Sequence, residues 1–119
     1  MRITIKSVRV NLSPALKEYV QKKVSALGRF LKRFDKNDSV TAAVEIERTT
    51  EHHRHGEIYH ASVDIDLPGK KIRAEEEHSD LLAAVEIAKD KAKTDVRKYK
   101  EKTVEKNSKR ARKKKRPGK

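Results

Sequence analysis

Basic side chains at helical spacing are the residues of this sequence best suited to chemistry. Seven lysines and arginines stand between residues 89 and 102, against the three acids Asp90, Asp95 and Glu101. These basic residues are Lys89, Lys91, Lys93, Arg97, Lys98, Lys100 and Lys102. Ammonium and guanidinium groups at this density attract phosphate groups, so the pattern is typical of nucleic-acid binding or, alternatively, of a solvated helix surface.

The histidines raise the question of a metal site. His52, His53 and His55 stand close together, but the chain has no cysteine and no fixed carboxylate partner is evident. We therefore expect a surface loop here and no bound metal. His60 and His78 fit strand and turn positions.

Three consecutive acids, Glu75, Glu76 and Glu77, are the remaining candidates for chemistry. One of them could serve as a general base. However, successive side chains of a strand point to opposite faces, and neither a nucleophile nor a glycine-rich phosphate loop accompanies them. We therefore expect a protein that is not an enzyme and that carries no cofactor.

Composition limits the class of protein to one small domain. The chain has 119 residues, of which 34% are hydrophobic, 4% aromatic and 41% charged, so we expect a modest, aliphatic core. The absence of cysteine fits a reducing compartment. No apolar run is long enough for a signal peptide or a membrane span, so we expect a soluble, cytoplasmic protein.

The net charge of +13 is unevenly distributed along the chain. Residues 1–38 and the residues from 87 onward are strongly basic, whereas residues 39–86 hold more acids than bases. Two basic helices over a sheet that does not bind would produce this distribution. Composition alone fits equally well a solvated surface with a basic tail.

The N-terminal third predicts a strand followed by a helix. Residues 2–10 alternate between apolar and polar types and then slip phase, which a strand with a bulge would explain. Ser13 and Pro14 form a typical helix start, because a serine caps the first turn and a proline loses no hydrogen bond there. The apolar stripe that follows predicts a helix through about Phe34.

The middle of the chain predicts three strands. Residues 40–47 and 59–67 alternate between apolar and polar types, which indicates two half-buried strands. Pro68 and Gly69 are typical of a tight turn, and Ile72 begins a fourth, short strand.

The C-terminal part predicts a helix with a basic tail. Apolar residues recur every three or four positions over 81–99, and Ser79 is the expected N-cap. We expect residues 1–103 to form a binding domain and residues 104–119 to be a basic, disordered tail, because like charges repel and no apolar period remains.

The predicted order is therefore β-α-β-β-β-α, an α+β fold. A crossover helix permits the first two strands to be parallel neighbours, and short turns make the later strands an antiparallel meander. The two helices would then pack on one face of the four-stranded sheet. The other face would be acidic and wet, with Glu45, Glu47, Asp64 and Asp66.

Several of these segments resemble a known family. The run from Ala61 to Glu75 (ASVDIDLPGKKIRAE), followed by Asp80–Glu86 and a lysine-rich helix, resembles the ribosome hibernation promoting factor family in its short form. This family includes the ribosome-associated inhibitor also called protein Y. The resemblance covers about residues 1–103 and includes the helix start at Ser13. The family fold is related to double-stranded RNA-binding domains and agrees with the order predicted above.

The resemblance implies a translation inhibitor that contacts ribosomal RNA of the small ribosomal subunit. Such a protein would bind in the decoding channel between head and body, exclude messenger and transfer RNA sterically, and silence ribosomes under stress. Among the helical cations, Lys91, Arg97, Lys98 and Lys102 match the family's basic positions, and Lys22, Lys23 and Arg29 match them more weakly. Lys89 and the tail residues Lys109, Arg110 and Arg112 complete the predicted RNA-binding set. We expect a monomer when the protein is free.

Two other functions remain open from the residues themselves. One is a general double-stranded RNA-binding or RNA-chaperone module. The other is a protein-interaction domain that modulates transcription and carries an incidental basic tail.

Overall fold

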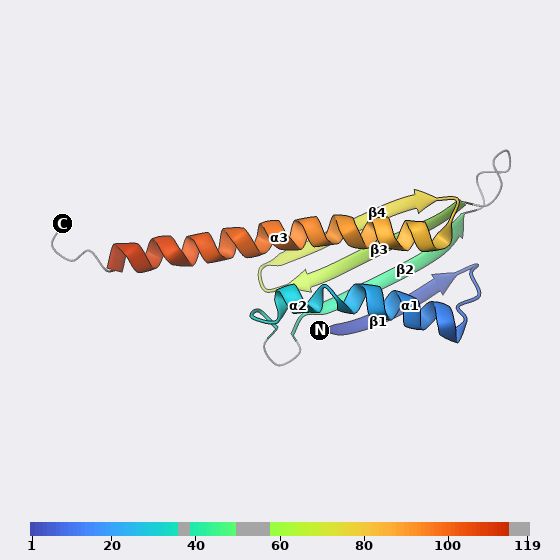
Figure 1. The fold of residues 1–119 in the computed structure, drawn as a ribbon, viewed down its shortest axis with the longest axis horizontal. Coiled ribbons are helices and arrows are strands. Elements are labelled where there is room, and N and C mark those ends of the chain that lie inside the picture. The colour runs from blue at the N-terminus through green and yellow to red at the C-terminus, as the bar shows by residue number, and fades with distance from the viewer. Residues whose placement is uncertain (36–38, 50–57, 115–119) are drawn as a thin grey trace.

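The computed structural model describes the backbone of residues 1–35, 39–49 and 58–114, with side chains through Lys102. Within these segments a four-stranded sheet in the order β1-β2-β3-β4 carries the helices on one face (Figure 1). The elements are β1 (Arg2–Val8), α1 (Pro14–Ser25), α2 (Gly28–Leu31), β2 (Thr41–Thr49), β3 (Ile58–Leu67), β4 (Lys70–His78) and α3 (Leu81–Lys114). No helix in the described segments is long and apolar enough to cross a membrane.

The sheet pairing confirms the predicted topology. β1 and β2 are parallel, and β2, β3 and β4 form an antiparallel meander. The predicted bulge in the first strand is wrong, because the register runs without a break from Arg2 opposite Thr41 to Val8 opposite Glu47. The change of phase comes instead at Arg9, whose φ of 58° ends the strand.

The first helix begins as predicted but ends earlier. Ser13 Oγ accepts a hydrogen bond from the backbone N–H of Leu16 at 3.2 Å, and Pro14 is the first helical residue. The helix does not continue to Phe34, however, because the chain tightens before Gly28. The N–H of Leu27 donates to the carbonyl of Val24, three residues back instead of four, at 3.0 Å. The buried stripe nevertheless continues from α1 into the four-residue helix α2.

The β3–β4 hairpin turns at Pro68 and Gly69, as predicted. Gly69 has a φ of +73°, which a residue without a side chain adopts easily. The strand after it was predicted to be short, but β4 has 9 residues and includes Glu75, Glu76 and Glu77. The prediction is wrong because β3 is long enough to pair with β4 along its whole length, from Leu67 to Tyr59.

The core between sheet and helices is aliphatic, as predicted from composition. The fully buried side chains are those of valine, leucine, isoleucine and alanine. Aromatic residues pack around this core and remain partly exposed; they are Tyr19, Phe30, Phe34 and Tyr99. These four aromatic rings therefore lie at the border between the core and solvent.

The last helix begins one residue later than predicted. Asp80, and not Ser79, caps it: Asp80 Oδ1 accepts from the N–H of Leu82 at 3.1 Å, and the Asp80 carbonyl accepts from the N–H of Ala84 at 3.0 Å. The helix then runs past Thr103 to Lys114, with no glycine or proline in between to stop it. The division into a binding domain ending at residue 103 and a separate tail stays a prediction.

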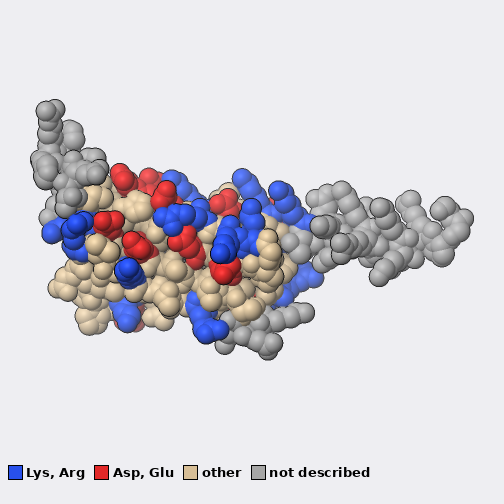
Figure 2. All heavy atoms as spheres, turned by 180° about the vertical axis from the view of Figure 1, so that it is seen from behind, with Lys and Arg blue, Asp and Glu red and all other residues tan. Residues whose placement is uncertain are grey.

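The face of the sheet opposite the helices is mixed in charge and not simply acidic. Figure 2 shows acidic and basic side chains interspersed on this face, seen from behind the view of Figure 1. Arg73 of β4 contacts Asp64 at 2.8 Å and Glu75 at 3.3 Å, and Arg9 contacts Glu47 at 3.3 Å. The acids expected on this face are present, but Glu47 and Asp64 are already paired with arginines.

Candidate nucleic-acid interface

Three cations of α3 gather around one aromatic ring of α2. The Nζ atoms of Lys93 and Lys100 lie 5.2 and 6.0 Å from the ring centroid of Phe30, and the guanidinium carbon of Arg97 lies 5.9 Å from it. These side chains belong together because residues spaced i, i+4 and i+7 share one side of a helix. We call Phe30, Lys93, Arg97 and Lys100 the seam cluster, since it lies where α2 meets α3.

The aromatic ring helps to order the seam cluster. A cation over the face of a phenylalanine gains about 0.5–1 kcal/mol at an exposed site. Within the described residues, no carboxylate lies within ion-pair distance of Lys93, Arg97 or Lys100. Three like charges therefore converge without a counterion among the described residues, which favours an anionic ligand above the seam.

Two predicted residues border the seam but are already paired. Lys23 of α1 lies 3.5 Å from Glu86 of α3 and 5.6 Å from the ring centroid of Tyr19. Lys89 lies 2.7 Å from Asp90. The Lys23–Glu86 pair is exposed enough to exchange its carboxylate for a phosphate at small cost, whereas the Lys89 side chain is only 15% exposed.

Lys22 and Arg29 are exposed on α1 and α2. They add positive charge to the helical face of the protein. Within the described residues, no ion pair holds either of them in one orientation.

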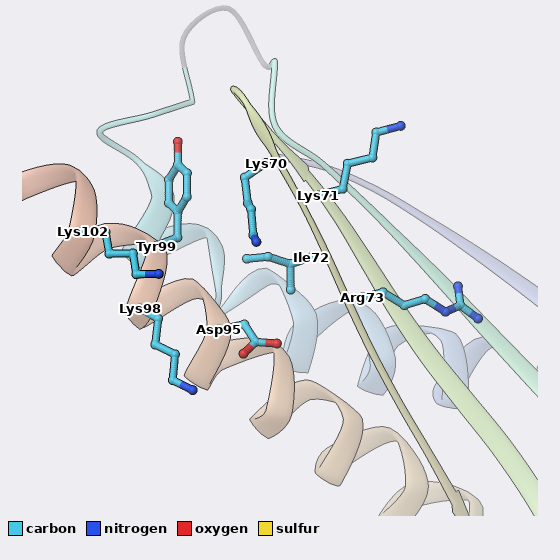
Figure 3. Close-up of a pocket in the computed structure, with 8 residues that line it drawn as sticks. All are labelled: Lys70, Lys71, Ile72, Arg73, Asp95, Lys98, Tyr99 and Lys102. Carbon is cyan, nitrogen blue, oxygen red and sulfur yellow. The ribbon is translucent and has the colours of Figure 1, made fainter.

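The other predicted residues of α3 lie on the opposite flank of that helix. Lys91 Nζ reaches β4, where it contacts Glu76 Oε2 at 3.0 Å and donates to the carbonyl of Glu75 at 3.2 Å. Lys98 and Lys102 line a pocket of about 540 Å³ between α3 and β4, which Figure 3 shows in close-up. The structure therefore divides the predicted set into two surfaces that face away from each other.

Hydrogen bonds shift the pKa values of several side chains along β4 in the direction that favours their charged forms. The pKa of Glu76 is lowered chiefly by its hydrogen bond from Lys91. The pKa of Glu75 is lowered by its hydrogen bond with His60 and by the charge of Arg73. The pKa of Arg73 is raised by its hydrogen bonds to Asp64. These groups remain charged at neutral pH.

The described histidines take structural positions. His60 Nε2 lies 3.1 Å from Glu75 Oε2 on the sheet, and His78 Nδ1 accepts from the N–H of Asp80 at 2.9 Å just before α3. Across the described segments, no group of three or more histidines and acids could hold a metal ion. His52, His53 and His55 lie outside the described residues.

Some residues of these surfaces were missing from the predicted set. They are Phe30, Lys70, Lys93 and Lys100. The spacing of positions 93, 97 and 100 is a signal that could have grouped these cations, but nothing local in the sequence pairs Phe30 with them. The predicted residues Lys109, Arg110 and Arg112 lie beyond the side chains that the structure describes.

Comparison with known proteins assigns the chain to a family. The model of the family described as "Sigma 54 modulation protein / S30EA ribosomal protein" matches residues 3–104. The chain belongs to this family. The resemblance noted from the sequence is thereby confirmed.

Relatives within the family carry names that refer to ribosome hibernation. A ribosome hibernation promoting factor of Azotobacter vinelandii is 28% identical over 105 residues, which are 88% of this chain and 88% of that protein. A ribosome hibernation promotion factor of Deinococcus radiodurans is 34% identical over 91 residues, which are 76% of this chain but only 44% of that protein.

Solved structures of the family share this fold. The N-terminal domain of protein Y from Thermus thermophilus matches with a TM-score of 0.66 and 29% identity over 83% of this chain and 99% of that chain. A ribosomal subunit interface protein from Coxiella burnetii has a TM-score of 0.63 at 24% identity over 84% of this chain and 98% of that chain, a likeness of fold alone. The predicted α+β fold is confirmed for this family member.

Proposed function

We propose that this protein is a ribosome-associated translation inhibitor that binds small-subunit RNA through the helical face around the seam cluster. The observation that carries the proposal is the convergence of Lys93, Arg97 and Lys100 on Phe30, with no counterion among the residues that the structure describes. Family membership and the names of the relatives supply the ribosomal partner. The two together favour the ribosome over an arbitrary polyanion.

The chemistry of the site supports recognition of backbone and shape. Ammonium and guanidinium groups bind phosphates, and most protein–nucleic acid hydrogen bonds of this kind position the protein without reading sequence. Single-strand binding modules instead expose aromatic rings on a sheet. The face of β3 opposite the helices holds His60, the buried Ser62 and Asp64, so stacking of bases on this sheet is disfavoured.

The mechanism that we propose is steric and needs no catalytic step. A monomer in the cytoplasm would occupy the decoding channel of the small subunit and exclude messenger and transfer RNA from it. Helices α1, α2 and α3 would face the RNA, and the mixed sheet face would point away from it. The ribosome would be stored in an inactive state for as long as the protein remained bound.

The proposed RNA interface does not include Lys91, Lys98 or Lys102. Their flank of α3 faces β4, so a straight segment of RNA that contacts the seam cluster cannot reach them at the same time. Of the RNA-binding residues predicted from the sequence, the proposal therefore keeps those near α1 and α2.

Co-sedimentation with purified small subunits tests the proposal directly. We expect saturation near one protein per subunit and loss of binding when transfer RNA already occupies the subunit. If about six to ten phosphate contacts form, affinity falls by about 10³ to 10⁵ between 50 and 200 mM salt. Binding that does not saturate and ignores transfer RNA would instead identify a general RNA-binding module.

A further inference from the structure

The outer edge of β4 is an open end of the sheet. β4 is last in the strand order, and in an antiparallel pair every second residue directs its N–H and C=O away from the partner strand. Two observations identify the outward set. The carbonyl of Glu75 accepts from Lys91 Nζ at 3.2 Å, and the N–H of Glu77 donates to Glu76 Oε1 at 3.3 Å. By the same alternation, Lys71 and Arg73 point their main-chain groups outward as well.

These outward groups face a groove between β4 and α3. The pocket of about 540 Å³ is lined on one side by Lys70 to Arg73 and on the other by residues of α3. A hollow of about 350 Å³ continues it along β4 as far as Glu75, and the two share Arg73 and Asp95. Figure 3 shows the side chains of Lys71 and Arg73 directed away from α3, so these two residues line the groove with their backbone. We call this feature the β4-edge groove.

The β4-edge groove is positively charged. Lys70, Lys98 and Lys102 line its wider part, where Asp95 is the single acid among the lining residues. None of these three lysines forms an ion pair with another described residue. Among the residues that the structure describes, the groove therefore combines cations that form no ion pair with outward-facing main-chain donors and acceptors.

The wall of the groove on α3 is held firmly. The hydroxyl of Tyr99 donates to the carbonyl of Pro68 at 3.1 Å, which ties α3 to the turn between β3 and β4. The ring of Phe34 packs edge-on against Tyr99, with ring centroids 5.2 Å apart. A ligand would thus enter a groove whose two sides are already fixed relative to each other, which lowers the entropic cost of binding.

We propose that the β4-edge groove binds an acidic polypeptide segment in extended conformation, which adds to β4 as a further strand. Edge strands bind peptides in this way, because main-chain hydrogen bonds provide affinity and neighbouring side chains provide selectivity. Lysine side chains alone would suit RNA equally well. The outward N–H and C=O groups of Lys71 and Arg73 favour a peptide, because only a polypeptide offers donors and acceptors at the spacing of a strand.

The far end of the groove sets the length of the added strand. Lys91 covers the Glu75 carbonyl and is itself held by Glu76. A peptide therefore pairs first with Lys71 and Arg73, where the edge is open. It extends to Glu75 and Glu77 only by displacing the side chains of Lys91 and Glu76.

A labelled peptide of alternating glutamate and valine tests this proposal on the full chain. We expect saturable binding by fluorescence anisotropy, together with slower hydrogen exchange at the amides of Lys71 and Arg73 in NMR spectra. The same peptide with alternate amides N-methylated should bind at least about tenfold more weakly, because it cannot donate to β4. Equal binding of both peptides, or unchanged exchange at these two amides, would overturn the proposal.

Charge reversal in the groove tests its electrostatic part. Lys98→Glu together with Lys102→Glu should weaken peptide binding by about tenfold or more. Lys17→Glu with Lys32→Glu changes the exposed surface by the same charge and should leave the affinity for the peptide unchanged. If the groove variant instead lost affinity for a short RNA oligonucleotide and kept its affinity for the peptide, the groove would be an RNA site and the proposal would be wrong.

Discussion

Removal of the three seam cations should flatten the salt dependence of ribosome binding. In the variant Lys93→Ala, Arg97→Ala and Lys100→Ala, the ring of Phe30 and the buried face of α3 remain intact. Each lost phosphate contact reduces the slope of log K against log salt by about 0.7 to 0.9, so three contacts reduce it by about 2 to 3. Between 50 and 200 mM salt, the fall in affinity should therefore be about 20- to 40-fold smaller than for the unchanged protein.

The assay is titration of labelled protein with small subunits at several salt concentrations. The matched variant Lys70→Ala, Lys98→Ala and Lys102→Ala removes the same charge from the groove between α3 and β4 and should keep a slope close to that of the unchanged protein. Both variants lose three positive charges, so a difference between their slopes reports the position of the cations and not the net charge of the protein. Equal slopes for the two variants would show that only total charge matters, and the seam would then not be the RNA interface.

Three further predictions concern the ring of Phe30, the carboxylate of Asp35 and the segment beyond Thr103. Phe30→Leu keeps an apolar side chain but removes the aromatic face, so affinity for small subunits should fall about two- to fivefold in the same titration; an unchanged affinity would mean that the ring does not order the cations. Asp35→Asn should lower the free energy of unfolding in urea by about 1 kcal/mol at neutral pH, because the Asp35 carboxylate accepts hydrogen bonds from the Met1 amino group and from the N–H of Val40. These bonds lower the pKa of Asp35 below its ordinary value of 3.8, so the difference should persist above 3.8 and vanish as pH falls through the lowered pKa; a difference that grows in acid would contradict this. A protein that ends at Thr103 should still fold and compete with transfer RNA for the same site, although with lower affinity, and a shifted footprint on the subunit would show that the segment beyond Thr103 places the protein.

The sheet could be predicted from the sequence because its signals are local. Alternation along β2 and β3 and the Pro68-Gly69 turn determine strand and hairpin without reference to the rest of the chain. The ends of the elements were harder to predict. Whether Ser79 or Asp80 caps α3, and whether α1 continues through Gly28, depend on competing backbone geometries that differ by small free energies.

The division of the cations into two flanks is a tertiary property. The apolar stripe of α3 predicts which side of the helix is buried, and positions 93, 97 and 100 fall on one side of that stripe while 91, 98 and 102 fall on the other. Which side meets α2 and which meets β4 depends on how the connection from β4 places α3 on the sheet. The pairing of Phe30 with three cations far along the chain depends on the same placement, so no local pattern predicts it.

The distance between the two flanks has a consequence for how they act. An α-helix with its side chains is about 10–12 Å across, whereas the Debye length at physiological salt is about 8 Å. A polyanion on the seam cluster would therefore neutralise the β4-edge groove only weakly. RNA on one side of α3 and an acidic strand on the other would bind almost independently, and the affinity of the groove for its peptide should be nearly the same on the ribosome as in free protein.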